Sequence, residues 1–399
     1  MTNPQEPTPN GALSLYESAS CPYYTADRCR SCSLLGAPAG ERLKTKVAAL
    51  HSALALHGVV PKRINPIVIP SNPWGSRHKV KMSVFGDCQE PGLGIIRSDQ
   101  SAVDLIDCPL GTAQITELMR HLRKIIRDRS LTPYNLSTRQ GELKQIVVMT
   151  TSDNSAGILR LILRSTECIP RIRKAIGELQ KDLPWVRVIS CNIQPILAAI
   201  PEGEQERVLS DQGEIREQFG EIPLYLTPRS FMQVTPEVAR QLYSNAAEIA
   251  RKRMPEHILD LFCGVGGFAL HVAKYAKRVT GVELSESAIR AASRSAKELN
   301  YQHVEFHSAD SEDYLLRNPN IAPDMVVVNP PRRGLSPGII SELIRLKPES
   351  IIYSSCNPTS FARDVAALKD NYTVLELTPF DMFPLSEHCE VLCTLTSRP

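Results

Sequence analysis

Apolar runs and amphipathic segments alternate regularly from residue 256 onward. Each apolar run is short and rich in β-branched residues, which is typical of buried strands, and the amphipathic segment at 286–299 predicts a helix. Strands and helices that alternate in this way form a parallel sheet with helices on both faces. The pattern therefore predicts an α/β fold. The expected strands are residues 257–262, 279–283, 303–307, 324–328, 351–356, 372–377 and 391–395.

The pattern is more mixed before residue 226. Apolar residues at helical spacing predict a helix over residues 41–57, ended by a glycine, and a second helix is expected near 169–180. Basic and apolar residues alternate at 76–84, as in a strand with one solvated face. These basic side chains suit RNA phosphates, although such positions are more often simply solvated. Further strands are expected within 139–149 and at 158–164, 186–193 and 196–200.

These patterns indicate an α+β domain over residues 21–225 and an α/β domain over residues 226–399. Residues 1–20 are rich in Pro, Ser, Asn and Thr without a sustained period, which predicts a disordered tail. A length of 399 residues agrees with two or three domains, and 42% apolar with 22% charged residues is an ordinary globular composition.

The net charge, the lengths of the apolar runs and the N-terminal residues indicate which partners and which cell compartment to expect. A net charge of +3 tolerates a nucleic-acid partner without requiring one. No apolar run approaches the roughly 18 residues of a membrane span, and the N-terminus lacks the order of a signal peptide. We therefore expect a cytoplasmic protein that has no contact with a membrane, and no obligate protein partner is evident.

The cysteines are expected to be reduced, and three of them form a group. Of the 11 cysteines, Cys21, Cys29 and Cys32 follow a C-x7-C-x2-C spacing, which suits thiolates bound to one metal centre. A fourth ligand is usual, and Cys108, which precedes a proline, is a better candidate than Cys88. Four thiolates suit zinc or an iron-sulfur cluster equally, and three unrelated buried cysteines remain the plainer alternative.

Polar residues follow the predicted strands of the α/β domain. The first strand runs into a glycine-rich turn at residues 260–267, and the second ends in Glu283, about 20 positions later. This pair suits the ribose of NAD or of S-adenosyl-L-methionine. The turn lacks the spaced glycines that hold a pyrophosphate, and Asn329-Pro330-Pro331 ends the fourth strand, so the methyl donor is favoured.

A cysteine beside a methyl donor predicts one particular chemistry. Cys356 ends the fifth strand, where a cysteine is a buried apolar residue or a nucleophile. Uracil C5 is a weak nucleophile, and a thiolate that adds to C6 activates it. The C5 proton must then leave to a base. Glu390 is our first candidate for this base and His388 the second.

These motifs resemble the signatures of RNA uracil-C5 methyltransferases. The resemblance covers nearly the whole chain from Cys21, and the segments 21–32, 131–135 and 139–144 are most similar to the subgroup that methylates a uridine of 23S ribosomal RNA. It implies a class I (Rossmann-like) S-adenosyl-L-methionine-dependent domain. It also implies that the N-terminal α+β domain carries a [4Fe-4S] cluster.

The resemblance also implies roles for individual residues. Cys356 would be the nucleophile and Glu390 the base. The expected cluster ligands are Cys21, Cys29, Cys32 and Cys108. The expected contacts to the methyl donor are Gln233, Phe262, Glu283 and Asn329, and Asp310 is expected to add a contact to the adenine amine.

Three alternatives remain open at this point. The substrate of uracil methylation could be tRNA instead of 23S ribosomal RNA. Cytosine-C5 methylation uses the same addition step, but the paired-cysteine motifs that it needs are missing. A non-catalytic rRNA-binding assembly factor would use the cluster as a structural clamp and would have no need of Cys356 or Glu390.

Overall fold

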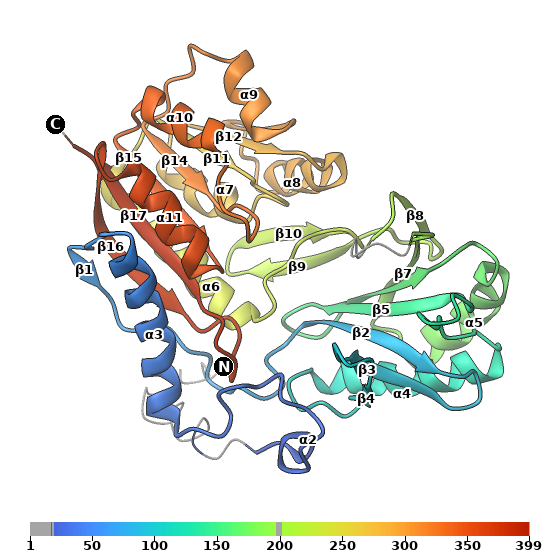
Figure 1. The fold of residues 1–399 in the computed structure, drawn as a ribbon. Coiled ribbons are helices and arrows are strands. Elements are labelled where there is room, and N and C mark those ends of the chain that lie inside the picture. Colours follow the sequence, from blue (N-terminus) through green and yellow to red (C-terminus); the bar gives the residue numbers. More distant parts are fainter. Residues whose placement is uncertain (1–16, 18–19, 197–201, 399) are drawn as a thin grey trace, which may run out of the picture.

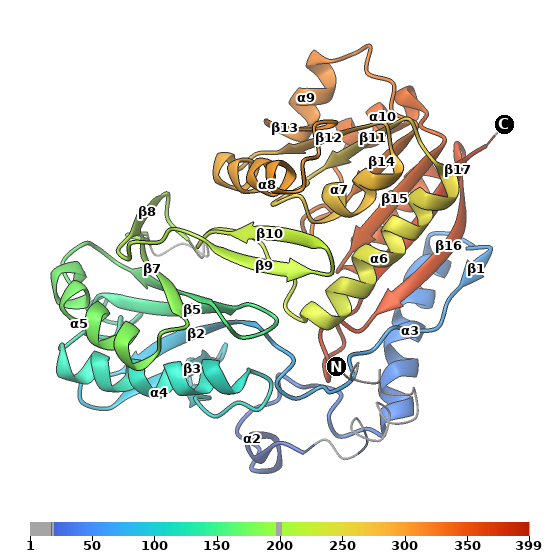
Figure 2. The same cartoon turned by 180° about the vertical axis from the view of Figure 1, so that it is seen from behind.

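Two sheets dominate the computed structural model, which describes residue 17, residues 20–196 and residues 202–398. An eight-stranded sheet and its helices form one body and a seven-stranded sheet the other, with a two-stranded hairpin between them (Figures 1 and 2). The predicted tail over residues 1–20 and the predicted strand at 196–200 lie almost wholly outside the described residues.

The eight-stranded sheet contains every strand predicted from residue 256 onward. Its order is β1-β16-β17-β15-β14-β11-β12-β13. The strands from β13 to β15 are parallel, whereas β17 lies antiparallel between β15 and β16. The α/β class is therefore confirmed. The bounds are β1 (Arg63–Ile64), β11 (His257–Leu261), β12 (Arg278–Glu283), β13 (Val304–Ser308), β14 (Met325–Val328), β15 (Ser350–Ser355), β16 (Tyr372–Phe380) and β17 (Glu390–Ser397).

Helices cover both faces of this sheet, and each face has its own apolar core. On one face lie α6, α7, α8 and the hairpin; on the other lie α3, α9, α10 and α11. Continuous burial on both faces explains why the strands are almost entirely apolar. The helices are α3 (Ala39–Leu56), α6 (Pro236–Arg253), α7 (Gly267–Val272), η1 (Ala273–Tyr275), α8 (Glu286–Glu298), α9 (Ser311–Arg317), α10 (Pro337–Leu346) and α11 (Pro358–Leu368).

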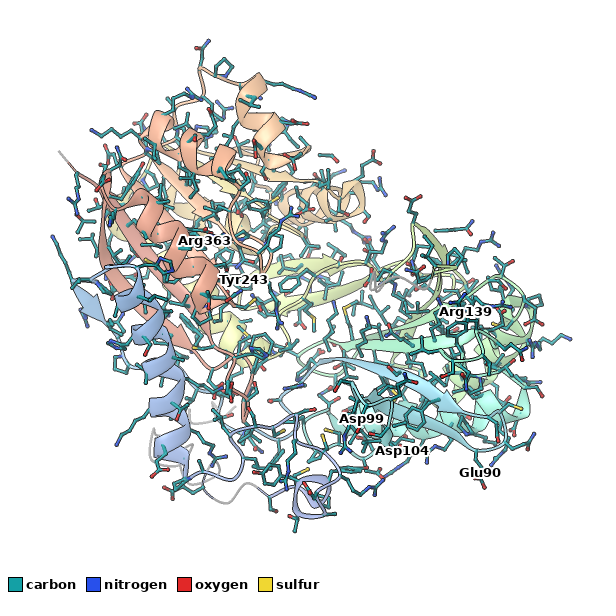
Figure 3. All side chains as sticks on the ribbon, in the orientation of Figure 1. Glu90, Asp99, Asp104, Arg139, Tyr243 and Arg363 are labelled. Atoms are coloured by element: carbon teal, nitrogen blue, oxygen red, sulfur yellow. The ribbon has the colours of Figure 1, made fainter. Side chains whose placement is uncertain are left out.

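Two segments that precede residue 226 pack on the eight-stranded sheet. Helix α3 lies against α11, and β1 pairs with β16 (Figure 1). The hairpin of β9 (Ile215–Phe219) and β10 (Ile222–Leu226) packs on α6 and α7 through Phe219, whose ring meets that of Tyr243 edge-on at 5.5 Å (Figure 3 labels Tyr243). The predicted helix at 41–57 thus supports the C-terminal sheet.

The seven-stranded sheet forms the core of the second body. Its order is β4-β3-β2-β5-β6-β7-β8, and α4 and α5 pack on one face. The sequence pattern predicted β2, β5, β6, β7 and α5, but not the other elements. No described helix of the molecule has both the length and the apolar character needed to cross a bilayer. The bounds are α2 (Pro22–Thr25), β2 (Lys79–Gly86), β3 (Pro91–Ile96), β4 (Ala102–Asp104), α4 (Ala113–Asp128), β5 (Leu143–Thr150), β6 (Gly157–Leu163), α5 (Ile169–Asp182), β7 (Val186–Ile193) and β8 (Gln205–Val208).

Candidate active site and cysteine site

Sheet register brings the two candidate catalytic residues together. Strands β15 and β17 are antiparallel, and Ser355 pairs with Val391. Cys356 directly follows β15 and Glu390 directly precedes Val391, so both lie at the same end of neighbouring strands. This is the carboxyl edge of the parallel strands, where ligands of open α/β sheets bind.

Glu390 is a buried carboxyl group with two polar partners. Glu390 is only 2% exposed. Its Oε1 accepts hydrogen bonds from Ser354 Oγ at 2.5 Å and from Asn329 Nδ2 at 3.4 Å. Burial raises the pKa of Glu390 to about 7, and the two hydrogen bonds oppose that rise. A carboxyl group with such a pKa can exchange a proton near neutral pH, as a general base requires.

Cys356 is half-buried at the start of α11. Burial and the nearby Glu390 raise the pKa of its thiol, whereas the guanidinium of Arg332 lowers it. The main chain of Arg332 is fixed in place because its carbonyl accepts hydrogen bonds from Asn357 Nδ2 at 2.8 Å and Ser360 Oγ at 3.0 Å. No role was predicted for Arg332 from the sequence.

The glycine-rich turn after β11 places Glu283 beside the sheet edge. Phe262, Gly264 and Gly266 have φ values of +65°, +54° and +86°, so the chain turns tightly away from the strand. Gly264 N then donates to Glu283 Oε2 at 3.3 Å. The predicted turn and the predicted acid thus lie together, and Asn329 follows the neighbouring strand β14.

The other predicted residues have different surroundings. Asp310 caps α9, because its Oδ1 accepts from the backbone N of Glu312 at 2.9 Å and of Asp313 at 3.2 Å, while Oδ2 takes part in neither bond. Gln233 is 4% exposed in the segment before α6. The ring of His388 packs edge-on against Phe383 at 5.9 Å, in the loop before Glu390.

Asp260 is a buried acid for which no role was predicted from the sequence. It is fully buried on β11, and its Oδ2 accepts from Ala269 N at 2.9 Å. Burial raises its pKa to about 8. This side chain therefore ties the strand to the first turn of α7, which fixes the geometry of the glycine-rich segment between them.

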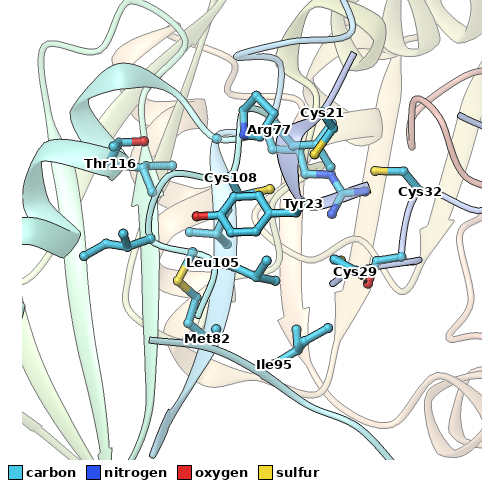
Figure 4. A pocket seen from close by; sticks show the side chains of 18 of the residues that line it. Cys21, Tyr23, Cys29, Cys32, Arg77, Met82, Ile95, Leu105, Cys108 and Thr116 are labelled. Carbon is cyan, nitrogen blue, oxygen red and sulfur yellow. Dashed lines mark hydrogen bonds between the residues drawn. The ribbon is translucent and has the colours of Figure 1, made fainter. Parts of the chain in front are cut away.

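The four predicted cysteine ligands line one cavity of about 310 Å³ (Figure 4). Cys21 precedes α2, Cys29 and Cys32 lie in the loop after it, and Cys108 comes from the segment between β4 and α4. Cys88 is not among the described residues on the cavity wall. The rest of the wall is mainly apolar and also carries the cationic side chains of Arg77, Lys79 and Lys81.

The spacing of these thiols is wider than a single zinc ion requires. Among the described residues, one group of three possible ligand atoms lies within 4.8 Å of one another, and it consists of Glu142, Glu167 and Cys168. Any three of the four cysteine sulfurs therefore include at least one pair that is more than 4.8 Å apart. Four thiolates on one tetrahedral zinc ion lie ~3.8 Å apart. Four thiols around one cavity are a donor set that suits zinc or an iron-sulfur cluster.

Known proteins resemble this chain over most of its length. The model of the tRNA (uracil-5-)-methyltransferase family matches residues 205–398. The 23S rRNA (uracil(747)-C(5))-methyltransferase RlmC of Pectobacterium atrosepticum is 42% identical over 375 residues, which is 94% of this chain and 99% of that protein. The chain belongs to the RNA uracil-C5 methyltransferase family. RlmC of Escherichia coli strain SE11 is 40% identical over 378 residues, covering 95% of this chain and all of that relative.

A solved structure extends the comparison to the fold of the family. The tRNA (uracil-54, C5)-methyltransferase of Pyrococcus abyssi, in complex with S-adenosyl-L-homocysteine, is 26% identical and superposes with a TM-score of 0.73. The match covers 92% of this chain and 86% of that one. The similarity in fold therefore extends over both sheets of this molecule and their helices.

Proposed function

We propose that this enzyme methylates C5 of a specific uridine in 23S ribosomal RNA, with S-adenosyl-L-methionine as methyl donor. The observation that carries the proposal is the register of β15 and β17, which sets Cys356 and Glu390 at one sheet edge. The RlmC relatives, 40–42% identical over nearly the whole chain, support 23S ribosomal RNA as the substrate.

The reaction uses the two residues in sequence. The Cys356 thiolate adds to C6 of uracil, and the electrons of the C5–C6 double bond move to form an enolate. S-adenosyl-L-methionine supplies an electrophilic methyl group, which C5 of the enolate accepts. Glu390 then removes the C5 proton, the C5–C6 double bond re-forms, and the Cys356 thiolate leaves. The RNA gains one methyl group and the carboxyl group gains one proton.

Residues at the sheet edge have distinct roles toward the methyl donor. We assign Glu283 the hydrogen bonds to ribose hydroxyls, because it ends the strand next to the glycine-rich turn. We assign contacts with the methyl donor to Phe262, Asn329 and Gln233, and a contact with the adenine amine to Asp310, whose Oδ2 takes no part in the two capping bonds. Asn329 is an amide and therefore cannot act as an acid.

We further propose that Cys21, Cys29, Cys32 and Cys108 hold a [4Fe-4S] cluster. Four thiols around one cavity support a bound metal centre, and the resemblance to uracil-C5 methyltransferases supports a cluster over zinc. Methyl transfer needs no electron, so we assign the cluster a role in folding and in positioning RNA. The cysteines come from α2 and its loop and from the segment before α4, so a bound cluster would join these two parts of the chain.

Tritium release from uracil C5 tests the function directly. Purified protein and S-adenosyl-L-methionine are incubated with transcripts of 23S ribosomal RNA or tRNA that carry tritium at uracil C5. We expect release from 23S ribosomal RNA alone. Release from tRNA instead would keep the chemistry but overturn the substrate. Absence of release from both, with the methyl donor bound, would favour a non-catalytic RNA-binding protein.

A further inference from the structure

Helix α3 places a lysine on its buried face. Four buried residues are spaced four positions apart on this helix and therefore lie on one face: Arg42, Lys46, Leu50 and Leu54. Two of them are cationic and two are leucines. Lys46 is only 1% exposed. Burying an ammonium group is unfavourable unless its three N–H donors find acceptors. The surroundings of Lys46 supply three.

All three acceptors belong to the loop between β16 and β17. Lys46 Nζ forms an ion pair with the buried carboxylate of Asp381, and it donates to Phe383 O at 3.0 Å and His388 O at 3.1 Å. Asp381 follows the end of β16, whereas His388 lies two residues before Glu390. One ammonium group therefore connects both ends of this loop.

We propose that Lys46 is a positioning residue for Glu390, an inference that rests on the proposed function. Phe380 pairs with Glu390 across β16 and β17, and the loop between them has to fold back on itself. The side chain of Glu390 projects from the first residue of β17, so small shifts of His388 move it directly. Lys46 fixes those two ends without touching the reacting atoms.

The place of Glu390 in the reaction gives Lys46 a distinct kinetic signature. Glu390 acts after Cys356 has added and the methyl group has been transferred. A misplaced base therefore delays proton removal and leaves the methylated RNA attached to Cys356. Because a misplacement of ~1 Å can slow a step ~100-fold, the covalent adduct should accumulate. A general loss of structure would instead slow adduct formation and proton removal together.

The test measures the two half-reactions in Lys46→Met. A 23S ribosomal RNA transcript with tritium at uracil C5 is mixed with protein and methyl-labelled S-adenosyl-L-methionine. Protein-linked RNA is followed on denaturing gels and tritium release in the supernatant. We expect tritium release to fall at least ~10-fold while adduct formation changes less than ~2-fold. Lys44→Met, an exposed neighbour on α3, should match the native protein in both rates.

Two further variants address folding. Lys46→Met leaves Asp381 buried without its lysine, which can unfold the chain. Lys46→Met/Asp381→Leu removes both charges but still loses the bonds to Phe383 and His388, so it should fold and accumulate adduct. Lys46→Arg keeps the charge with a different reach and should give an intermediate release rate.

The outcomes separate this inference from the proposed function. Glu390→Gln must accumulate the methylated adduct if Glu390 is the base, and its failure to do so would overturn that role whatever Lys46 does. If Glu390→Gln accumulates adduct but the folded Lys46 variants release tritium at the native rate, the positioning role is wrong. A parallel fall of both rates in a folded Lys46 variant would also overturn it.

Discussion

Among single residues, Cys356 has the clearest expected effect. Its sulfur is the proposed nucleophile, whereas the neighbouring thiol of Cys389 is buried and donates to the main-chain carbonyls of Phe380 at 3.4 Å and Glu390 at 3.2 Å. We expect Cys356→Ala to lower tritium release from 23S ribosomal RNA at least ~1000-fold. The half-buried side chain is small, so the melting temperature should change little. Cys88→Ala is the matched control, and methylation by Cys356→Ala would refute the mechanism.

Ser354 tunes the proton affinity of the base. Its hydroxyl donates to Glu390 at 2.5 Å, which stabilises the carboxylate and opposes the rise that burial causes. Glu390 has to be ionised to act as a base, and the rate of proton removal should therefore rise with pH around a midpoint of about 7. In Ser354→Ala the carboxylate loses this donor, so its pKa and the midpoint should move upward.

The pH profile of tritium release from the preformed adduct measures this shift. Ser295→Ala is a suitable control, because Ser295 is also fully buried but donates to Ala291 O on α8. Its profile should equal that of the native protein. A midpoint in Ser354→Ala that stays at the native value or moves downward would contradict the assignment.

The sequence indicated the proposed reacting residues more readily than the residues that adjust them. Cys356 and Glu390 were predictable because each stands beside a strand with motif residues around it. Arg332 and Ser354 lie inside the same motifs, but their effects depend on which side chains meet across two strands, and the linear sequence does not specify this. Lys46 could have been noticed in the sequence, because its spacing from Leu50 and Leu54 places a cation on the apolar face of the predicted helix.

At the scale of elements, the β9–β10 hairpin should contribute substantially to stability. Phe219 is 2% exposed and its ring packs edge-on against Tyr243 and His271, which joins the hairpin to α6 and α7. We expect Phe219→Ala to lower the free energy of unfolding by ~3–5 kcal/mol. Leu316→Ala, at a 61% exposed site, should change it by less than ~0.5 kcal/mol. Urea unfolding compares them, and equal values would show that the hairpin packs loosely.

The elements themselves were largely predictable, but several of their partners were not. Periodicity identified the strands from 257 onward and the helix near 41–57. It could not predict that β17 enters between β15 and β16, or that β1 joins β16 across more than 300 residues of sequence. Such pairings are decided by burial in three dimensions, which a local pattern does not contain. Strands β3 and β4 and helix α4 were missed altogether.

At the scale of the whole molecule, the cysteine site and the loop before Glu390 are in contact. Leu385 is 1% exposed and packs in one apolar cluster with Cys21 and Cys32, and its carbonyl accepts from Leu34 N at 3.1 Å. The loop is thus held by Lys46 from α3 and by the cysteine segment from the other body. Changes at the proposed cluster should therefore reach the loop.

Removal of the cluster should loosen that loop. We expect Cys32→Ser to lose bound iron, to melt at a lower temperature and to show faster amide exchange over residues 381–389, because Leu385 then loses its ordered neighbours. Iron and sulfide content, thermal unfolding and hydrogen exchange measure these effects on the purified full chain. Cys88→Ser should keep iron and native exchange. Slow exchange in an iron-free Cys32→Ser would show that the cysteine site and the loop are independent, and retained iron would remove Cys32 from the ligand set.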